Sequence, residues 1–327
     1  MKILITGSTG FIGRALCAYL LPDHTIVGID RIQNPDEATG IIWEAADLTD
    51  RDAVTALCKK HSPDVVIHCA GIAHQKIGAV STATYMQVNS EVTESLARSA
   101  AASNPGVRFI FFSSVSVYGE GDFTEAVSEE HECHPSSDYA ASKLDAEKRL
   151  AALVTDGVIR NVSVLRLAPV YDRAWTLNLD RRVFAPKKLA YLRFGSGSQR
   201  MSALARPNLL AFIAHMLQLE HSPKLRTVNV CDTEPYQFHT IIKAFRDSGI
   251  RTNRPVISIP LPVVWLATRI AAVFFSQRKE WIHSGYYKLA SDLVFDNRKM
   301  LETGFRPIHA LETIFSTDDL TQRRKGR

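Results

Sequence analysis

A glycine-rich turn near the start of the chain constrains its fold more than any other feature. The apolar run Lys2–Thr6 predicts a β-strand, and Gly7, Gly10 and Gly13 follow it before a helical pattern. Glycines at these places permit a tight turn, close approach of a pyrophosphate to the backbone, and close packing of the helix on the strand. The helix N-terminus adds N–H donors and positive potential. The sequence therefore predicts a dinucleotide-binding turn, to which Thr9, Phe11 and Ile12 also belong.

An acidic residue ends the second predicted strand, at Ile29-Asp30. In dinucleotide-binding units a carboxylate at this distance from the glycines binds the adenosine ribose hydroxyls. Asp30 would repel the additional phosphate of NADP, although Arg31 beside it could partly accommodate that group. We therefore expect NAD as the cofactor, with NADP less favoured.

Apolar runs alternate with helical patterns over the first half of the chain, which predicts an α/β fold of the Rossmann type, a doubly wound parallel sheet. The expected strands are Lys2–Thr6, Thr25–Ile29, Ile41–Glu44, Val65–Cys69, Arg108–Ser113 and Val162–Leu167. The expected helices are Gly13–Leu21, Asp50–His61, Met86–Ser103 and Tyr139–Thr155.

Proline and glycine interrupt the pattern after about residue 172, which indicates a smaller, irregular lobe. We expect an NAD-binding domain over residues 1–171, with a strand returning to its sheet near 226–232, and a mainly substrate-binding lobe over residues 172–327. The apolar segment Leu261–Ser276 is short and contains Arg269, so we expect a core, subunit-contact or interfacial helix and no transmembrane span. Peripheral membrane attachment is the lesser alternative.

Charge and cysteine content narrow the class of protein. The formal net charge of +5 includes four basic residues among the last five positions, so the charges of the rest of the chain nearly cancel. The sequence therefore gives no sign of the positive surface that nucleic-acid binding requires. The five cysteines contain no C-x-x-C pair, which favours neither disulfides nor a metal site. Met1 runs directly into the first strand, so we expect no cleavable signal peptide and a cytoplasmic protein.

Tyrosine and lysine four residues apart give the strongest chemical signal. Tyr139 and Lys143 fall on one face of a predicted helix, where the ammonium and a bound nicotinamide cation would lower the tyrosine pKa. Tyr139 could then act as acid or base. A serine-bearing strand, Phe109–Ser114, precedes this helix and ends where open α/β sheets present their ligands.

Several of these motifs resemble the extended short-chain dehydrogenases/reductases, within the NAD-dependent epimerase/dehydratase family. The resemblance rests on the glycine turn, the pair Asp47-Leu48, Ser113-Ser114-Val115-Ser116-Val117-Tyr118-Gly119 and the Tyr139–Lys143 pair. It implies that Ser114 binds the substrate oxygen, Tyr139 moves the proton and Lys143 positions the nicotinamide ribose. It further implies cofactor contacts at Asp47, Leu48, Cys69, Ala70, Gly71, Asn89 and Pro169.

The substrate expected by the same resemblance is a nucleotide sugar, most simply a UDP-linked one. Arg166–Tyr171 and Gln199–Ser202 are similar to segments of UDP-glucose or UDP-N-acetylglucosamine 4-epimerases and UDP-4-keto-6-deoxy-N-acetylhexosamine 4-reductases. Arg200 suits a diphosphate because its guanidinium offers paired donors, although a surface ion pair is the plain alternative. His74 and Ser116 are further candidate substrate contacts, and Asp172 departs from the glycine usual at its position.

Two classes of function remain open. The leading one is Tyr139-assisted hydride transfer at the sugar C4, as a 4-epimerase with retained NAD or as a 4-keto reductase or dehydrogenase with exchangeable cofactor. A non-catalytic NAD-binding regulator is the alternative from another class. Dehydration is disfavoured, because Ser113-Ser114-Val115 stands where the resemblance implies Thr-Asp-Glu in dehydratases. A homodimer and a role in surface-polysaccharide precursor synthesis are also implied by the resemblance.

Overall fold

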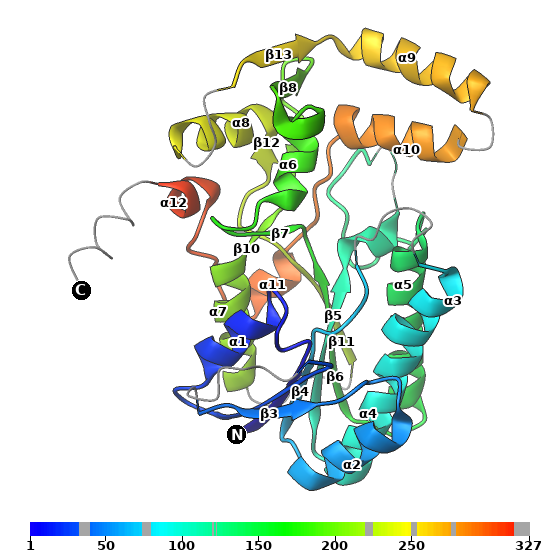
Figure 1. Cartoon of the computed structure of the whole chain (residues 1–327), viewed down its shortest axis with the longest axis vertical. Helices are drawn as coiled ribbons and strands as arrows, with labels where there is room; N and C mark the ends of the chain where they lie inside the picture. Colours follow the sequence, from blue (N-terminus) through cyan, green and yellow to red (C-terminus); the bar gives the residue numbers. More distant parts are fainter. Residues whose placement is uncertain are drawn as a thin grey trace. The chain divides into compact units, whose positions relative to one another are not determined.

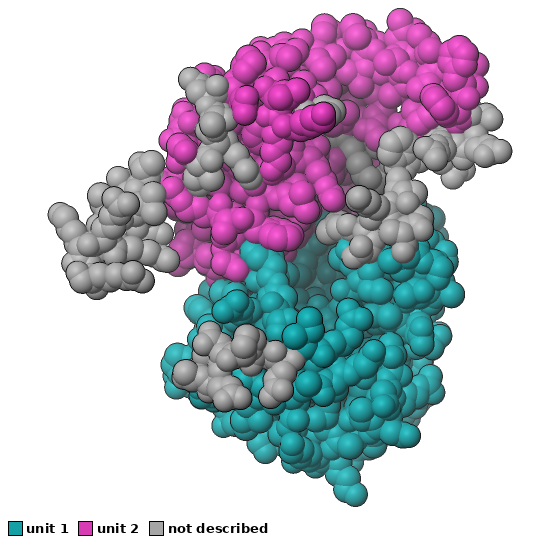
Figure 2. Space-filling model, viewed as in Figure 1, with its two compact units in different colours: residues 1–119, 132–167, 210–228 teal, residues 120–131, 168–209, 229–327 magenta. Residues whose placement is uncertain are grey.

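The computed structural model describes residues 1–32, 40–73, 80–119, 121, 123–219, 225–249, 254–275 and 279–316. The chain divides into two compact units (Figure 2), and both are assembled from separated segments. Unit 1 consists of residues 1–119, 132–167 and 210–228, and unit 2 of residues 120–131, 168–209 and 229–327. From the sequence we expected an NAD-binding domain over residues 1–171 with a strand return near 226–232, and a mainly substrate-binding lobe over residues 172–327.

A seven-stranded sheet of order β11-β6-β5-β4-β1-β2-β3 organises unit 1. Strands β1 to β6 pair in parallel, as the alternating pattern of the sequence predicts. The seventh strand, β11, lies beside β6 in this sheet and is formed by residues 225–230. The strands are β1 Lys2–Thr6, β2 Thr25–Asp30, β3 Ile42–Ala45, β4 Val65–His68, β5 Arg108–Ser114, β6 Asn161–Leu167 and β11 Leu225–Val230.

Helices cover both faces of this sheet (Figure 1), with α2, α4 and α5 on one side and α1 on the other. They pack through apolar side chains such as Leu96, Leu150 and Phe109, which are almost completely buried. The helices are α1 Gly13–Leu20, α2 Arg51–His61, α3 Thr82–Tyr85, a π-helical turn Met86–Glu91, α4 Val92–Ser103, a 3-10 helix Val115–Tyr118 and α5 Asp138–Thr155.

Short strands and helices form unit 2 around a separate apolar core that includes Tyr171, Tyr191 and Phe245. Three two-stranded pairs join β7 with β10, β9 with β12, and β8 with β13. The strands are β7 Val170–Tyr171, β8 Tyr191–Phe194, β9 Arg200–Met201, β10 Leu204–Ala205, β12 Tyr236–Gln237 and β13 Val256–Ile259. The helices are α6 Leu177–Val183, a 3-10 helix Pro186–Lys188, α8 Phe238–Asp247, α9 Leu261–Phe274, α10 Lys279–Ala290, α11 Arg298–Glu302 and α12 Leu311–Phe315, while α7 Arg206–Gln218 contributes to both units.

Parallel pairing places the carboxyl ends of the unit 1 strands along one edge of the sheet. Thr6 ends β1, Asp30 ends β2, His68 ends β4 and Ser114 ends β5. Open α/β sheets bind their ligands outside this edge. None of the described helices is both long enough and apolar enough to cross a membrane.

Candidate functional site

The turn between β1 and α1 has the geometry that its three glycines predict. Gly7 has a φ of +65°, and a side-chain carbon there would lie 2.9 Å from the backbone of Ala70. A Cβ on Gly13 would lie 2.1 Å from the carbonyl oxygen of Gly7, so the helix could not pack this closely on the turn with any other residue. At Gly10 such an atom would meet only the Gly7 oxygen, at 3.1 Å, so this glycine leaves open space beside the backbone.

The same turn offers a favourable place for an anion. Helix α1 begins without a side-chain cap, so the positive end of its helix dipole faces this turn with no side-chain acceptor on it. The hydroxyl of Ser8 is buried and has no hydrogen-bond partner among the described residues. Open space at Gly10, the Ser8 hydroxyl and the positive end of α1 suit the pyrophosphate of a dinucleotide.

The Asp30 carboxylate is held against this turn. Its Oδ2 accepts hydrogen bonds from the Thr9 amide at 3.1 Å and the Thr9 hydroxyl at 2.7 Å, and its Oδ1 accepts one from the Arg31 amide at 2.8 Å. Thr9 and Asp30, which were both predicted to contact the cofactor, are therefore brought together. Asp30 remains half-buried at the sheet edge, where a ribose would meet it.

The pair Asp47-Leu48 has a local structural role in addition to its expected one. Asp47 Oδ1 accepts hydrogen bonds from the amide and hydroxyl of Thr49, at 2.9 Å and 2.8 Å, and these bonds lower the pKa of its carboxyl. Leu48 packs against the apolar core of unit 1. The pair thus shapes the loop between β3 and α2 at the sheet edge.

Beyond β4, Cys69 and Ala70 lie at the same edge. Burial raises the pKa of the Cys69 thiol well above its usual value, so the sulfur stays protonated and is a poor nucleophile. The Ala70 amide donates to the Thr6 hydroxyl at 3.2 Å. A side chain on Gly71 would come within 2.9 Å of the Asn89 oxygen, so this glycine makes room for a buried amide.

Asn89 is fully buried within the π-helical turn, which excludes the alternative of a surface amide. Its Oδ1 accepts from the Ile72 amide at 2.7 Å, and its Nδ2 donates to the Ile72 carbonyl at 3.0 Å and to the Ser142 hydroxyl at 3.0 Å. The amide therefore joins the segment after β4 to helix α5. Such π-helical turns occur frequently at functional sites, and the sequence pattern gave no indication of one.

Ser114, Tyr139 and Lys143 meet beside the end of β5. The hydroxyls of Ser114 and Tyr139 are hydrogen bonded to each other. The amide and hydroxyl of Ser116 both donate to Ser114 Oγ, at 3.2 Å and 2.9 Å, so Ser116 orients the candidate substrate ligand. Helix α5 places Lys143 one turn after Tyr139, with its ammonium 2.9 Å from the Phe112 carbonyl oxygen.

Burial sets the protonation of the tyrosine and the lysine. It lowers the pKa of Lys143 to about 8 and raises the pKa of Tyr139, which the hydrogen bond from Ser114 only partly offsets. The lowered tyrosine pKa expected from a neighbouring ammonium is therefore absent in the protein alone, because removal of the phenolate from water is the larger effect. The second expected contribution, that of a nicotinamide cation, requires the bound cofactor.

A buried network that the sequence did not suggest lies next to these three residues. The Ser113 hydroxyl donates to Glu147, whose carboxylate forms an ion pair of 2.7 Å with Arg166. The Arg166 guanidinium also lies over the ring of Tyr118, 4.8 Å from its centroid. The Ser113 hydroxyl is thus already used in a hydrogen bond to Glu147, which favours Ser114 over Ser113 as the substrate ligand. No motif could have revealed the network, because its members lie on β5, α5 and β6.

The remaining candidates that the structure describes lie outside the cluster of Ser114, Tyr139 and Lys143. His74 is not among the described residues. Pro169 lies in unit 2, where its carbonyl accepts from the Leu204 amide at 3.1 Å. Arg200 pairs with Asp292 at 2.8 Å on the surface of unit 2, the arrangement foreseen as the plain alternative to a diphosphate ligand. Asp172, the residue that departs from the usual glycine, forms an ion pair with Arg206.

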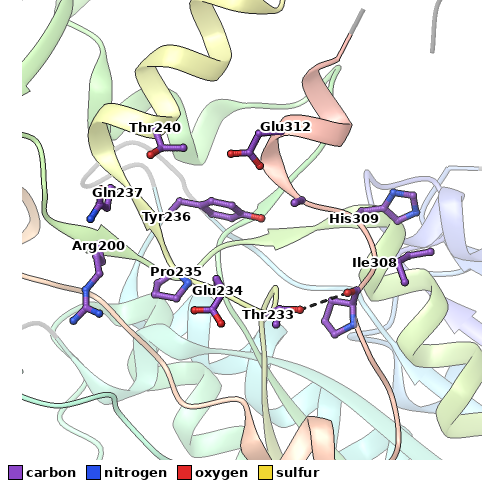
Figure 3. A pocket seen from close by; sticks show the side chains of 12 residues that line it. Arg200, Thr233, Glu234, Pro235, Tyr236, Gln237, Thr240, Ile308, His309 and Glu312 are labelled. Carbon is purple, nitrogen blue, oxygen red and sulfur yellow. Dashed lines mark hydrogen bonds between the residues drawn. The ribbon is translucent and has the colours of Figure 1, made fainter. Parts of the chain in front are cut away.

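A pocket of about 440 Å³ in unit 2 contains Arg200 (Figure 3). Its floor includes Tyr236, and Glu234 and Glu312 add acidic groups. Thr233 closes one side by donating to the Pro307 carbonyl at 3.4 Å. The lining of the pocket combines apolar residues with charged side chains of both signs. The described part of the chain has no cluster of histidine, cysteine and acidic side chains that could hold a metal.

Known proteins resemble this chain over most of its length. The sequence model of the family described as "NAD dependent epimerase/dehydratase family" matches residues 3–231. UDP-glucose 4-epimerase of Vibrio cholerae is 31% identical over 269 residues, which cover 80% of this chain and 79% of that protein. dTDP-glucose 4,6-dehydratase of Haemophilus influenzae is 30% identical over 164 residues, 44% of this chain and 48% of that protein.

Solved structures share the fold over the full length. UDP-glucose 4-epimerase from Thermotoga maritima, with UDP-glucose, has a TM-score of 0.74 at 19% identity and covers 100% of both chains. UDP-glucuronic acid 4-epimerase from Bacillus cereus, in complex with NAD, has a TM-score of 0.73 at 21% identity, again over 100% of both chains. With a matched family region spanning most of the sequence, the chain belongs to the NAD dependent epimerase/dehydratase family of enzymes.

Proposed function

We propose that this protein is an NAD-dependent nucleotide-sugar enzyme that oxidises and reduces C4 of a UDP-hexose or UDP-N-acetylhexosamine. The juxtaposition of Ser114, Tyr139 and Lys143 at the carboxyl end of β5 carries the proposal. The 31% identity to the Vibrio cholerae UDP-glucose 4-epimerase, over four-fifths of this chain, supports the choice of substrate class.

Each residue of this site would have a separate role in the transfer of a proton and a hydride. Ser114 would hydrogen bond the oxygen on C4, and Tyr139 would take the proton of the C4 hydroxyl or return it to the C4 carbonyl. Lys143 would hold the cofactor ribose and keep a positive charge beside the tyrosine. A bound nicotinamide would supply the hydride acceptor and donor. Ser116 and Asn89 would position Ser114 and helix α5 without touching the reacting atoms.

The proposed contacts to the pyrophosphate and the adenosine ribose lie at the edge of the unit 1 sheet. The uncapped start of α1, the open space at Gly10 and the Ser8 hydroxyl would receive the pyrophosphate. Asp30 would bind the adenosine ribose and disfavour the phosphate of NADP, since two negative groups would meet there. Thr9 fixes the carboxylate for this role.

A 4-keto reductase or dehydrogenase uses the same residues and differs in whether the cofactor leaves after each turnover. To distinguish the two, the purified protein would be denatured and its released nucleotides identified by mass spectrometry, and the native protein would be incubated with a panel of UDP-sugars. Retained NAD together with sugar interconversion and no net cofactor change identifies an epimerase. An empty site with a substrate-dependent change in nicotinamide absorbance identifies the reductase, and tight NAD binding without turnover on any sugar identifies a regulator.

The same proposal includes a cytoplasmic homodimer that supplies precursors of surface polysaccharide. Sedimentation of the purified protein tests the assembly state, and a profile with monomer alone would contradict the dimer.

A further inference from the structure

Helix α9 exposes an apolar stripe in unit 2. Val263, Leu266, Ile270, Val273 and Phe274 recur at helical spacing and have exposed fractions between 50% and 79%. The opposite side of the helix is half-buried and packs against α10. No residue of α9 is fully buried, although apolar residues make up most of its sequence. A continuous apolar face that is exposed to water marks a site of contact with another molecule or with a membrane.

Groups suited to a membrane interface flank the stripe. Trp265 is 46% exposed, and the Arg269 guanidinium lies 5.0 Å from the centroid of its ring. Tryptophan and arginine both favour the boundary between acyl chains and headgroups, because each combines an apolar body with a polar end. A helix of this length is far too short to span a bilayer but long enough to lie in its surface.

A cationic groove of about 280 Å³ borders the strand that leads into α9. His239, Lys243 and Arg246 line it from successive turns of α8, and Arg193 lines it from β8. Ser258 of β13 belongs to the same groove and accepts a hydrogen bond of 2.8 Å from Arg193. Asp247 is the single acidic residue among the lining residues. Figure 1 draws α8, β13 and α9 at one end of unit 2.

We propose that unit 2 docks on an anionic lipid surface through the α9 stripe, with the groove of Arg193, Lys243 and Arg246 as its headgroup contact. The positive charge of the groove favours this partner, because a bilayer with acidic headgroups offers negative charge to the groove and apolar chains to the stripe. A second copy of the chain would bring another cationic groove instead. The proposal is independent of the reaction proposed for unit 1.

Flotation with lipid vesicles tests the proposal. The full-length protein is mixed with phosphatidylcholine vesicles, with or without phosphatidylglycerol, and the bound fraction is measured. We expect binding to the vesicles that contain phosphatidylglycerol, weakening as salt is added, and a blue shift of tryptophan emission that is lost in Trp265→Phe. Absence of wild-type binding to phosphatidylglycerol, or binding without this Trp265 signal, would overturn the proposal.

Paired variants separate the stripe from the groove. Ile270→Ser with Phe274→Ser removes apolar contact, and Lys243→Glu with Arg246→Glu reverses charge; each pair is expected to reduce the partition coefficient at least about tenfold. The matched controls are Ile257→Ser, exposed outside the stripe, and Lys148→Glu with Arg160→Glu, exposed in unit 1. Equal effects of test and control variants would overturn the proposal. If the stripe variant instead dissociates a dimer while wild type ignores vesicles, the stripe is an interface between copies and the lipid proposal is wrong.

Discussion

The ammonium of Lys143 donates a hydrogen bond of 2.9 Å to the carbonyl oxygen of Phe112. Phe112 precedes the two serines that end β5, so this contact fixes helix α5 against the strand that carries Ser114. The same ammonium lies 4.7 Å from the centroid of the Phe111 ring. A buried lysine with one backbone acceptor and one aromatic neighbour is costly to keep charged, which is why its pKa falls to about 8.

Replacing this lysine should stabilise the protein while abolishing its chemistry. Below about pH 8 the folded protein buries a charge that the unfolded chain leaves in water, whereas near pH 10.5 the lysine becomes neutral in both states. Lys143→Met should therefore raise the free energy of unfolding by up to roughly 3 kcal/mol at neutral pH, with the gain shrinking as pH rises from 8 to 10.5. Thermal denaturation across this pH range measures the gain. Lys148→Met, at an exposed position of the same helix, is the control, and an equal gain there would contradict the account.

The two serines at the end of β5 should separate into a structural and a catalytic residue. Ser113→Ala removes a donor from buried Glu147 and should lower the free energy of unfolding by about 1–2 kcal/mol. Ser114→Ala should leave stability nearly unchanged and lower turnover by about 100-fold, since it removes a ligand of the reacting oxygen. Denaturant unfolding and steady-state kinetics on both variants test this division. The opposite pattern, with turnover lost only in Ser113→Ala, would show that the serines were assigned wrongly.

The buried ion pair should be far more sensitive to loss of one partner than to loss of both. Glu147→Leu leaves the Arg166 guanidinium buried without its carboxylate and should cost about 3–5 kcal/mol of unfolding free energy. Adding Arg166→Met should recover most of that loss, because no charge then remains buried. Urea unfolding of the two single variants and the double variant measures the coupling. Additive losses would mean that the pair contributes little as a unit.

Cofactor preference should depend on Asp30. Asp30→Ser removes the negative charge at the end of β2, so NADP should bind at least about tenfold more tightly relative to NAD. Isothermal titration with both dinucleotides measures the ratio, with Asp52→Ser, which removes a carboxylate from α2, as the control. An unchanged ratio would show that Asp30 does not face the ribose.

The fold was largely predictable because both faces of the unit 1 sheet are covered. Strands such as Val65–His68 are buried along their whole length, so they appear in the sequence as uninterrupted apolar runs. Tyr139 and Lys143 were predictable because helical spacing alone places them on one face. In both cases the prediction needed only residues that lie close together in the sequence.

Features that depend on distant partners were not predictable. The Arg166–Glu147–Ser113 network joins two strands and a helix. For Arg200 a surface ion pair was foreseen, but not its partner Asp292, which lies 92 positions away. Asn89, in the π-helical turn, donates hydrogen bonds to Ile72 and Ser142, and no local pattern encodes these contacts. The rise in the Tyr139 pKa also depends on burial, which only the folded chain determines.

The central claim is that Tyr139 moves the proton of a nucleotide-sugar oxidation. The most direct measurement compares Tyr139→Phe with wild type on a UDP-sugar that the wild type converts, using Tyr19→Phe, an exposed tyrosine of α1, as the control. We expect Tyr139→Phe to keep its fold and its bound NAD while turnover falls by about 10²–10⁴-fold, and Tyr19→Phe to match wild type. Full turnover in Tyr139→Phe would contradict the claim.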